Sequence, residues 1–593
     1  MSFTSLLQDV LGEKTLGASL WAFRAELAIC ATIVALLLVR MVLPRWKSSA
    51  FYVMLLGTLA GLYWLIPGSA DGSQPPAGSQ ELFTGMLVSD GFSVFMRGLL
   101  LVFALLFATF TQVAGVPEED DAAEFYVLVL GALLGMCLMV SANHLVIVFL
   151  GVEMASVPSY VLAGILRHRR VSTEASLKYC VFGAGAAGVM LYGISLLAGV
   201  LGSAHLPTMA ARLAELNITG VTPEQTMVLV LGGLMVMVGL AFKLSAVPFH
   251  FWAPDVFEGA PAEVGAFLSI ASKAAALALL VRLVVGFGHV PLMTEVKFVL
   301  THSAAAADTQ EPAAIKSHLL ETILAGEAST NAGQPSSAIG RDAAVAPDGT
   351  KANTSASSPT LTEALGPTRQ FMCGLISLLA AVTCTFGNLA AYGQTNMKRL
   401  LAYSTIAHAG YMMMPVAAVA AVAGTNPEGA RNAVAAMGLY LGIYLFMNLG
   451  AFAFVAFLRN ATGSEQIADY AGLVRRSPGL TVCMTIILFS LVGLPPLAGF
   501  AAKFAVFARL FDARLLTLLV IGGLNTVLSL FYYLRVVRVM IISPERAERP
   551  APVIPLWSIP GAYCAVLTVP LLALFVWWDG LYQWVQAAMK SLL

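Results

Sequence analysis

Long apolar runs recur along almost the whole chain, and they constrain its fold more than any other feature. A helix needs about 20 mostly apolar residues to cross the hydrocarbon core of a bilayer. By this measure the sequence predicts an all-α polytopic membrane protein with about fourteen membrane-spanning helices. The predicted spans lie near 19–43, 51–66, 92–113, 124–141, 144–165, 177–200, 226–249, 264–286, 370–391, 400–423, 432–457, 480–508, 515–541 and 560–583.

The composition agrees with a membrane protein and excludes other classes. Only 11% of the 593 residues are charged, against about 25% in a soluble domain. The 33 Lys and Arg balance the 33 Asp and Glu, so the basic excess of a nucleic-acid binder is missing. The seven cysteines form no CxxC or Cys/His cluster, and we therefore expect no metal or iron–sulfur site in this chain.

The spans divide the chain into five predicted segments. Residues 287–369 interrupt the apolar pattern with a stretch rich in Ala, Ser, Thr, Pro and Gly, which predicts a flexible extramembrane insertion with a short helix near 315–324. A functional lid and a tolerated insertion both fit this stretch. The other segments are the first three spans at 1–123, a five-helix repeat at 124–286, a second five-helix repeat at 370–541, and a last helix at 542–593.

Basic residues follow the odd-numbered spans and so predict the orientation. Short cytoplasmic loops collect Lys and Arg. We therefore expect these loops in the cytoplasm, and both termini and the insertion outside. The residues concerned are Arg45, Lys47, Arg167, Arg169, Arg170, Lys398, Arg399, Arg475, Arg476, Arg546 and Arg549.

A few charged residues lie deep inside the predicted spans. A charge in the hydrocarbon core costs roughly 3 kcal/mol on insertion scales, so it needs a partner or water. Glu153, Lys178, Lys243, Lys273 and Lys503 occupy such positions in separate spans. A lysine among apolar helices can exchange a proton near neutral pH, and a mobile carboxylate partner would control that exchange. The five residues therefore predict a proton relay.

Other polar residues in the spans leave more than one interpretation open. Lys178 lies near the end of its span, where snorkelling to the interface and a functional role both fit. Arg282 and Arg535 are expected to anchor helix ends. His408 lies in a hydroxyl-rich segment, 403–411, where it would either line a water chain or satisfy hydrogen bonds between helices.

Helix-breaking residues flank two of the buried lysines. Lys243 is followed by Pro248, and Lys503 follows the sequence Gly-Leu-Pro-Pro at 493–496. Proline inside a membrane helix frees a carbonyl group and opens the helix. The two interrupted spans are five spans apart, and an odd repeat length predicts two inverted repeats, each with a broken helix at an ion site.

Several motifs together resemble one known family. The segment 394–411, QTNMKRLLAYSTIAHAGY, resembles the signature of subunit N of bacterial proton-translocating NADH:quinone oxidoreductase, respiratory complex I. The resemblance extends over nearly the whole chain except the insertion. Further segments that resemble this antiporter-like subunit are 149–162, 174–179, 243–261, 272–275 and 493–503.

The resemblance implies a subunit of the bacterial inner membrane that translocates protons while partner subunits oxidise NADH and reduce quinone. It implies that this chain itself holds no cofactor. FMN, iron–sulfur clusters, NADH and quinone are expected in the partner subunits. These partners are peripheral and membrane subunits and include neighbouring antiporter-like subunits. Lysine at 503, where a sister subunit has glutamate, favours subunit N. The family's proton-relay residues fall on Glu153, Lys178, Lys243, Lys273 and Lys503.

Two rival functions remain open at this point. Subunits of Na⁺/H⁺ antiporters and of membrane-bound hydrogenases share the same fold, and sodium-dependent transport without co-purifying flavin would support them. A structural scaffold, in which buried charges serve only assembly, is a rival of another class. A self-contained redox enzyme is not indicated, because no nucleotide fingerprint, haem ligand set or cluster motif appears.

Overall fold

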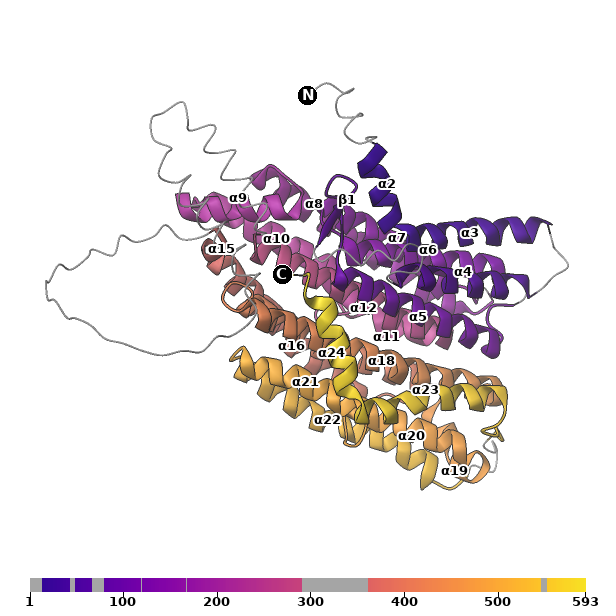
Figure 1. The fold of residues 1–593 in the computed structure, drawn as a ribbon. Coiled ribbons are helices and arrows are strands. Elements are labelled where there is room, and N and C mark those ends of the chain that lie inside the picture. The colour runs from indigo at the N-terminus through magenta and orange to yellow at the C-terminus, as the bar shows by residue number, and fades with distance from the viewer. Residues whose placement is uncertain are drawn as a thin grey trace, which may run out of the picture.

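The computed structural model describes residues 13–42, 48–66, 79–118, 120–166, 168–290, 361–545 and 552–592. Long helices lie side by side in one bundle, with the N-terminal half above the C-terminal half in Figure 1. Twelve of the helices in these ranges are long and apolar enough to cross a membrane, and two shorter apolar helices, α4 and α20, accompany them. This arrangement confirms the predicted all-α membrane fold and is compatible with about fourteen spans.

The helices of the two halves follow the predicted order. Those of the first half are α3 (Arg24–Val42), α4 (Ser49–Leu65), α5 (Gly91–Ala114), α6 (Ala122–Ser141), α7 (Leu145–Ala163), α8 (Arg170–Leu201), α10 (Pro223–Leu244), α11 (Trp252–Gly259) and α12 (Ala262–Gly288). Those of the second half are α16 (Gly366–Ala391), α17 (Met397–Val422), α18 (Pro427–Thr462), α20 (Pro478–Val492), α21 (Ala498–Asp512), α22 (Leu516–Ile541) and α23 (Ile559–Val576).

Smaller elements accompany the long helices. Two short strands, β1 (Gln80–Leu82) and β2 (Leu87–Ser89), pair antiparallel, with Gln80 opposite Ser89. The remaining helices are α2 (Glu13–Ala22), α9 (Leu206–Thr219), α15 (Leu361–Ala364), the 3₁₀ helix Ile467–Tyr470, α19 (Leu473–Arg476) and α24 (Trp578–Met589). In Figure 1, α24 crosses the long helices obliquely, and it contacts α5 and α18.

The structure refines several predicted spans. The span near 480–508 consists of α20 and α21, separated by a break, and the span near 560–583 consists of α23 and α24. The hairpin and α9 were not predicted, because their segments are too short or too polar to produce a spanning signal. The predicted helix near 315–324 lies outside the described residues.

The helices from α6 to α12 and those from α16 to α22 repeat one pattern: three continuous helices, a broken helix and a final helix. The broken helices are α10–α11 and α20–α21. Because each repeat crosses the membrane five times, the second repeat enters from the opposite side, as the inverted-repeat prediction requires.

The core of the bundle lies where the two repeats meet. All residues in the most apolar 18-residue stretch of α12 are buried, and so are 89% of the residues in the corresponding stretches of α17 and α18. These three helices contact one another. A charged side chain in the middle of α12 therefore depends on neighbouring helices for its hydrogen bonds.

Two buried ion pairs join the first helices to this core. The Arg282 guanidinium, on α12, donates two hydrogen bonds of 2.6 Å to the Asp90 carboxylate and one of 2.8 Å to the carbonyl of Val140. Arg97, on α5, lies 2.7 Å from Glu26 on α3. Arg282 was expected to anchor the end of its helix, and the structure shows that it connects α12 with α5 and α6.

Candidate functional site

The first broken helix exposes backbone groups in the middle of the bundle. The chain leaves α10 at Ser245, which has a left-handed φ of 56°. The indole of Trp252 donates a hydrogen bond of 3.0 Å to the carbonyl of Phe242, and Thr383 Oγ1 accepts one from the backbone N–H of Val247. Side chains thus replace the missing helical hydrogen bonds, and the last turn of α10 stays rigid next to the break.

Lys243 lies in this last turn, and its side chain is only 2% exposed. Its ammonium donates a hydrogen bond of 3.0 Å to Ser156 Oγ on α7. The half-buried Glu153 lies one helical turn before Ser156, and the charges of Glu153 and Lys243 interact. These two described side chains form no ion pair within 4.0 Å, so Ser156 holds the lysine close to the carboxylate without direct pairing.

Lys273 occupies the middle of α12 and is 1% exposed. Its ammonium donates a hydrogen bond of 3.2 Å to the backbone carbonyl of Thr405 on α17. One turn earlier on α12, Ser269 Oγ accepts a hydrogen bond of 2.6 Å from the Asn448 amide on α18. Polar groups from three helices therefore meet at the centre of the most buried part of the bundle.

His408 lies on α17 between two of the lysines. Its Nδ1 is 2.7 Å from the Tyr440 hydroxyl, and its Nε2 is 3.4 Å from the Tyr533 hydroxyl. The imidazole interacts electrostatically with both Lys273 and Lys503. Among the two interpretations of His408, hydrogen bonding between helices is thus observed, and its hydroxyl partners are also groups that can pass a proton.

Lys503 lies on α21, just after the second break, and is 4% exposed. Its ammonium donates a hydrogen bond of 2.9 Å to the carbonyl of Val492, the last residue of α20, and lies 4.4 Å from the centroid of the Tyr411 ring. Gly493 has a φ of 86°, and a Cβ at this position would lie 3.0 Å from Lys503 Cδ. The break therefore requires glycine next to the lysine.

The structure places Lys178 apart from these buried groups. Its side chain is 38% exposed and pairs with Glu174 at 2.9 Å and with Asp255 at 2.8 Å. Arg399 pairs with the other oxygen of Asp255 at 3.0 Å and with Glu258 at 2.7 Å. Lys178 therefore belongs to a charged cluster at an exposed end of α8, α11 and α17.

The remaining predicted site residues form a row across the bundle. Glu153, Lys243, Lys273, His408 and Lys503 come from α7, α10, α12, α17 and α21. Figure 1 shows α10, α12 and α21 following one another from the upper half to the lower half. The row thus runs over α10, α12, α17 and α21, each of which contacts the next.

Sequence reasoning missed several uncharged members of this row. Their hydroxyl and carbonyl groups supply the partners that the charged residues need, and the spacing of Ser156 one turn after Glu153 was a signal in the sequence. The missed residues are Ser156, Tyr440, Val492 and Tyr533, whereas Thr405 and Tyr411 belong to the hydroxyl-rich segment 403–411. No group of three or more His, Cys, Asp and Glu side chains in the described ranges has the arrangement of a metal site.

Comparisons with known proteins agree with this architecture. The family model for the membrane region of NADH:quinone oxidoreductase and Mrp antiporter subunits matches residues 142–306 and 360–529. NADH-quinone oxidoreductase subunit N of Anaeromyxobacter sp. (strain Fw109-5) is 35% identical over 595 residues, which cover 98% of each chain. Subunit N 1 of Rhizobium meliloti (strain 1021) is 33% identical and covers 90% of this chain and 91% of its own.

Solved structures show the same fold. A chain of respiratory complex I from Thermus thermophilus with bound Aureothin has a TM-score of 0.64 and 28% identity, and the match covers 94% of this chain and 98% of that one. A chain of the Mrp complex from Dietzia sp. DQ12-45-1b has a TM-score of 0.66 at 17% identity, over 97% and 98% of the two chains. The second likeness concerns the fold alone.

Proposed function

The chain belongs to the NADH:quinone oxidoreductase/Mrp antiporter family, among the relatives of subunit N, and we propose that its buried row of lysines carries protons across the membrane. The observation that carries this proposal is that Lys243, Lys273 and Lys503, on three different helices, are each almost fully buried and each bonded to a neutral oxygen. Keeping three unpaired ammonium groups in an apolar bundle is costly. A role in proton exchange explains why these positions hold lysine.

The proposed switch lies at Lys243. Ser156 accepts a hydrogen bond from the Lys243 ammonium, and Glu153 lies one helical turn before Ser156. A small shift of α7 along α10 would bring the carboxylate into direct contact and favour the charged lysine. The reverse shift would release the proton towards Lys273.

The next steps run through neutral groups. Lys273 releases its proton towards His408, whose imidazole nitrogens contact the hydroxyls of Tyr440 and Tyr533. A hydroxyl both donates and accepts hydrogen bonds, so it passes a proton without becoming charged for long. Lys503, which interacts electrostatically with His408, is the last lysine of the row.

The driving reaction belongs to partner subunits. We propose that NADH, FMN, iron–sulfur clusters and quinone are bound in those subunits, and that electron transfer there changes the pairing at Glu153. The site described here offers hydrogen-bonding and titratable groups and no cluster of metal ligands in the described ranges. Other membrane subunits of the antiporter-like type are the proposed direct neighbours.

The proposed location is the bacterial inner membrane, with both termini on the outer side. This orientation places Lys398, Arg475 and Arg476 at the cytoplasmic end of the bundle, as the distribution of basic residues in short loops favours. The other basic loop residues Arg45, Lys47, Arg167, Arg546 and Arg549 lie outside the described residues, and their contribution rests on the sequence.

The proposal is tested with the assembled complex in proteoliposomes. Lys273→Ala should leave NADH oxidation by the peripheral subunits detectable but lower the number of protons moved per NADH. Lys243→Ala should act in the same way, because it removes the switch. Proton movement equal to that of the unaltered complex in both variants would disprove the proposal. A gradient that depends on Na⁺, without co-purifying flavin, would instead support an antiporter or hydrogenase-type subunit.

A further inference from the structure

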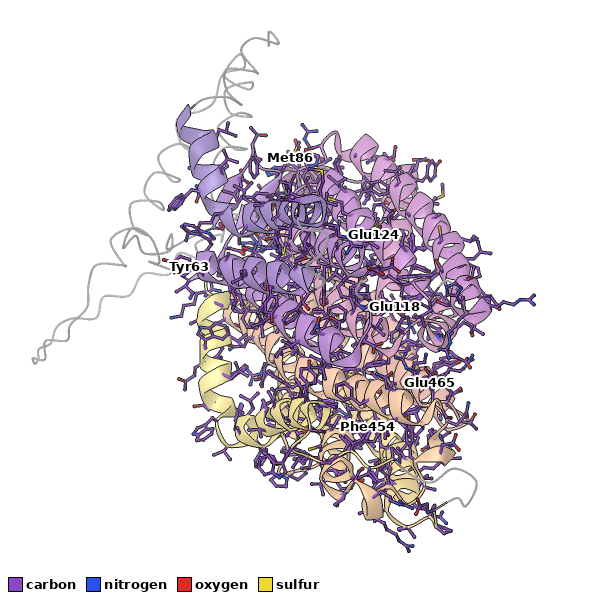
Figure 2. All side chains as sticks on the ribbon, turned by 90° about the vertical axis from the view of Figure 1, so that its right-hand side faces the viewer. Tyr63, Met86, Glu118, Glu124, Phe454 and Glu465 are labelled. Atoms are coloured by element: carbon purple, nitrogen blue, oxygen red, sulfur yellow. The ribbon has the colours of Figure 1, made fainter. Side chains whose placement is uncertain are left out.

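A second group of buried charges lies where α12 begins and α18 ends, away from the lysine row. Glu263, in the first turn of α12, is 0% exposed, and its Oε1 lies 3.6 Å from Arg459 in the last turn of α18. Lys398, at the start of α17, is also fully buried and pairs with Glu465 at 2.9 Å. Figure 2 labels Glu465, which follows α18 in the chain.

The two carboxylates of this cluster differ in their partners. Lys398 pairs with Glu465 and also donates hydrogen bonds of 2.7 and 2.8 Å to the carbonyls of Glu258 and Ala260, so its ammonium is fully used. Neither oxygen of Glu263 accepts a hydrogen bond from a described protein group. The contact of 3.6 Å with Arg459 is too long for a hydrogen bond.

A buried carboxylate without hydrogen bonds is costly as an ion, and the cost is relieved when it binds a proton or water. The charged groups that act on Glu263 come from every neighbouring element: Arg459 on α18, Lys398 on α17 and Glu465 after α18. Arg459 and Glu465 are 12% and 13% exposed, so the cluster lies directly beneath the aqueous edge of the bundle.

Polar side chains of α12 and α18 lie between the levels of Glu263 and Lys273 along the helices. Asn448 lies eleven residues before Arg459, about three helical turns, and so shares its face of α18. The Asn448 amide donates to Ser269 Oγ at 2.6 Å, while its Oδ1 has no described partner. Ser269 lies one turn before Lys273, on the same side of α12.

One aromatic ring separates the two polar contacts. Glu263 and Ser269 are about 9 Å apart along the axis of α12. Between them, the Phe452 ring lies so close to Gly265 that a Cβ there would be 2.8 Å from it. Water has to pass this ring for a proton to move from Glu263 to Ser269.

We propose that Glu263 is a proton-binding site that loads Lys273 from the end of the bundle where Lys398 and Arg459 lie. In the first step a proton from water forms an O–H bond with the Glu263 carboxylate. In the second step that O–H bond breaks and an N–H bond forms at the neutral amine of Lys273, through water and the hydroxyl of Ser269. The inference rests on the proposed function of Lys273, and the orientation proposed above makes this step an uptake from the cytoplasm.

The test uses Glu263→Gln in the assembled complex in proteoliposomes, with proton movement and NADH oxidation followed from mildly acidic to mildly alkaline pH. The variant keeps the size of the side chain but cannot bind and release a proton. We expect proton movement by this variant to fall at least several-fold, and the decrease should be largest at alkaline pH, where protons are scarce. Glu263→Asp should recover much of the activity. Glu428→Gln is the matched control, because Glu428 is also an acidic residue in the first turn of its helix, α18, but is exposed, and this variant should keep the pH profile of the unaltered complex.

A Glu263→Gln complex with an unaltered pH profile would overturn the inference. If that variant does not assemble, Ser269→Ala keeps Glu263 and removes the hydroxyl through which the proton is proposed to pass, and it should give the same alkaline loss. An unaltered pH profile of Ser269→Ala also overturns the inference. Lys273→Ala, measured in parallel, separates the two proposals. A defect in Lys273→Ala without one at Glu263 refutes only the loading site, whereas normal proton movement in Lys273→Ala refutes the proposed function.

Discussion

The ammonium of Lys503 donates a hydrogen bond to the carbonyl of Val492, the residue that ends α20. A helix carries partial negative charge at its C-terminus, which stabilises a nearby cation by about 0.3–1 kcal/mol and by up to about 2 kcal/mol in buried positions. Lys243 lies in the last turn of α10 itself, and its ammonium donates to Ser156 on α7. The two lysines differ in sequence, one before its break and one after, yet both lie at the negative end of the first half of a broken helix.

The break next to Lys503 gives a first prediction. Gly493→Ala places a methyl group in a left-handed conformation that costs roughly 1–2 kcal/mol, and this Cβ would lie 3.0 Å from Lys503 Cδ. We expect lower thermal stability of the assembled complex and weaker proton movement. Gly523→Ala on α22 is the control, because no atom lies within 4 Å of its added Cβ. Equal effects of both variants would show that the break does not position the lysine.

The hydrogen bond between α7 and α10 gives a second prediction. Ser156→Ala leaves the Lys243 ammonium without its oxygen partner, which costs about 1–3 kcal/mol. We expect a several-fold decrease in protons moved per NADH, with normal assembly. Ser159→Ala is the matched control, since Ser159 Oγ donates only to the Ala155 carbonyl of its own helix. If the two variants behave alike, Ser156 has no special part in the switch.

The surroundings of His408 give a third prediction. Tyr440→Phe removes the hydroxyl that lies 2.7 Å from the imidazole and keeps the ring. We expect slower proton movement between Lys273 and Lys503, measured as a reduced proton-to-NADH ratio. Tyr563→Phe serves as control, because its hydroxyl donates to the Leu106 carbonyl outside the row. A Tyr440→Phe complex with the unaltered ratio would exclude the hydroxyl from the path.

These residues show which parts of the candidate site could be predicted from the sequence and which could not. Charges in apolar runs identified Glu153, Lys243, Lys273 and Lys503, because each charge is costly there and stands out. The proline and glycine pattern identified both broken helices. Hydroxyls such as those of Ser156 and Tyr440 were not predicted as site groups. A serine or tyrosine in a membrane helix is common and has a low free-energy cost, and only the packing of distant helices reveals its partner.

For Lys178 the sequence predicted a deeper position than the structure shows. Its charge inside a predicted span and its place in a motif made it a candidate for the relay. The depth of a side chain depends on where the helix ends, however, and α8 extends seven residues further towards Arg170 than the apolar run indicated. Glu263 was not predicted as a buried charge, for a related reason. It lies at the first turn of its helix, where acidic residues are usual, and only the cover provided by α17 and α18 makes it a buried charge.

The buried ion pair between Asp90 and Arg282 gives a prediction about stability. Asp90→Asn leaves the Arg282 guanidinium as an uncompensated buried charge, and breaking a buried pair in this way costs about 3–5 kcal/mol. We expect a strong loss of assembled complex, measured as the amount of this chain that co-purifies with its partners. Arg40→Gln breaks an exposed pair with Asp120, worth about 0–1 kcal/mol, and should assemble normally. Similar yields of both variants would contradict the structural role of the buried pair.

Lys178 gives the last prediction, which separates an exposed cluster from the relay. Because its ammonium is shared between Glu174 and Asp255 at an exposed end of α8, and Arg399 continues to pair with Asp255, Lys178→Gln removes a replaceable charge. We expect at most a modest decrease in proton movement, far smaller than that of Lys273→Gln, in proteoliposomes measured at equal amounts of complex. High salt should weaken the remaining effect, since exposed charges are screened. A loss as large as that of Lys273→Gln would mean that protons pass through Lys178, and the row would then extend to the exposed end of α8.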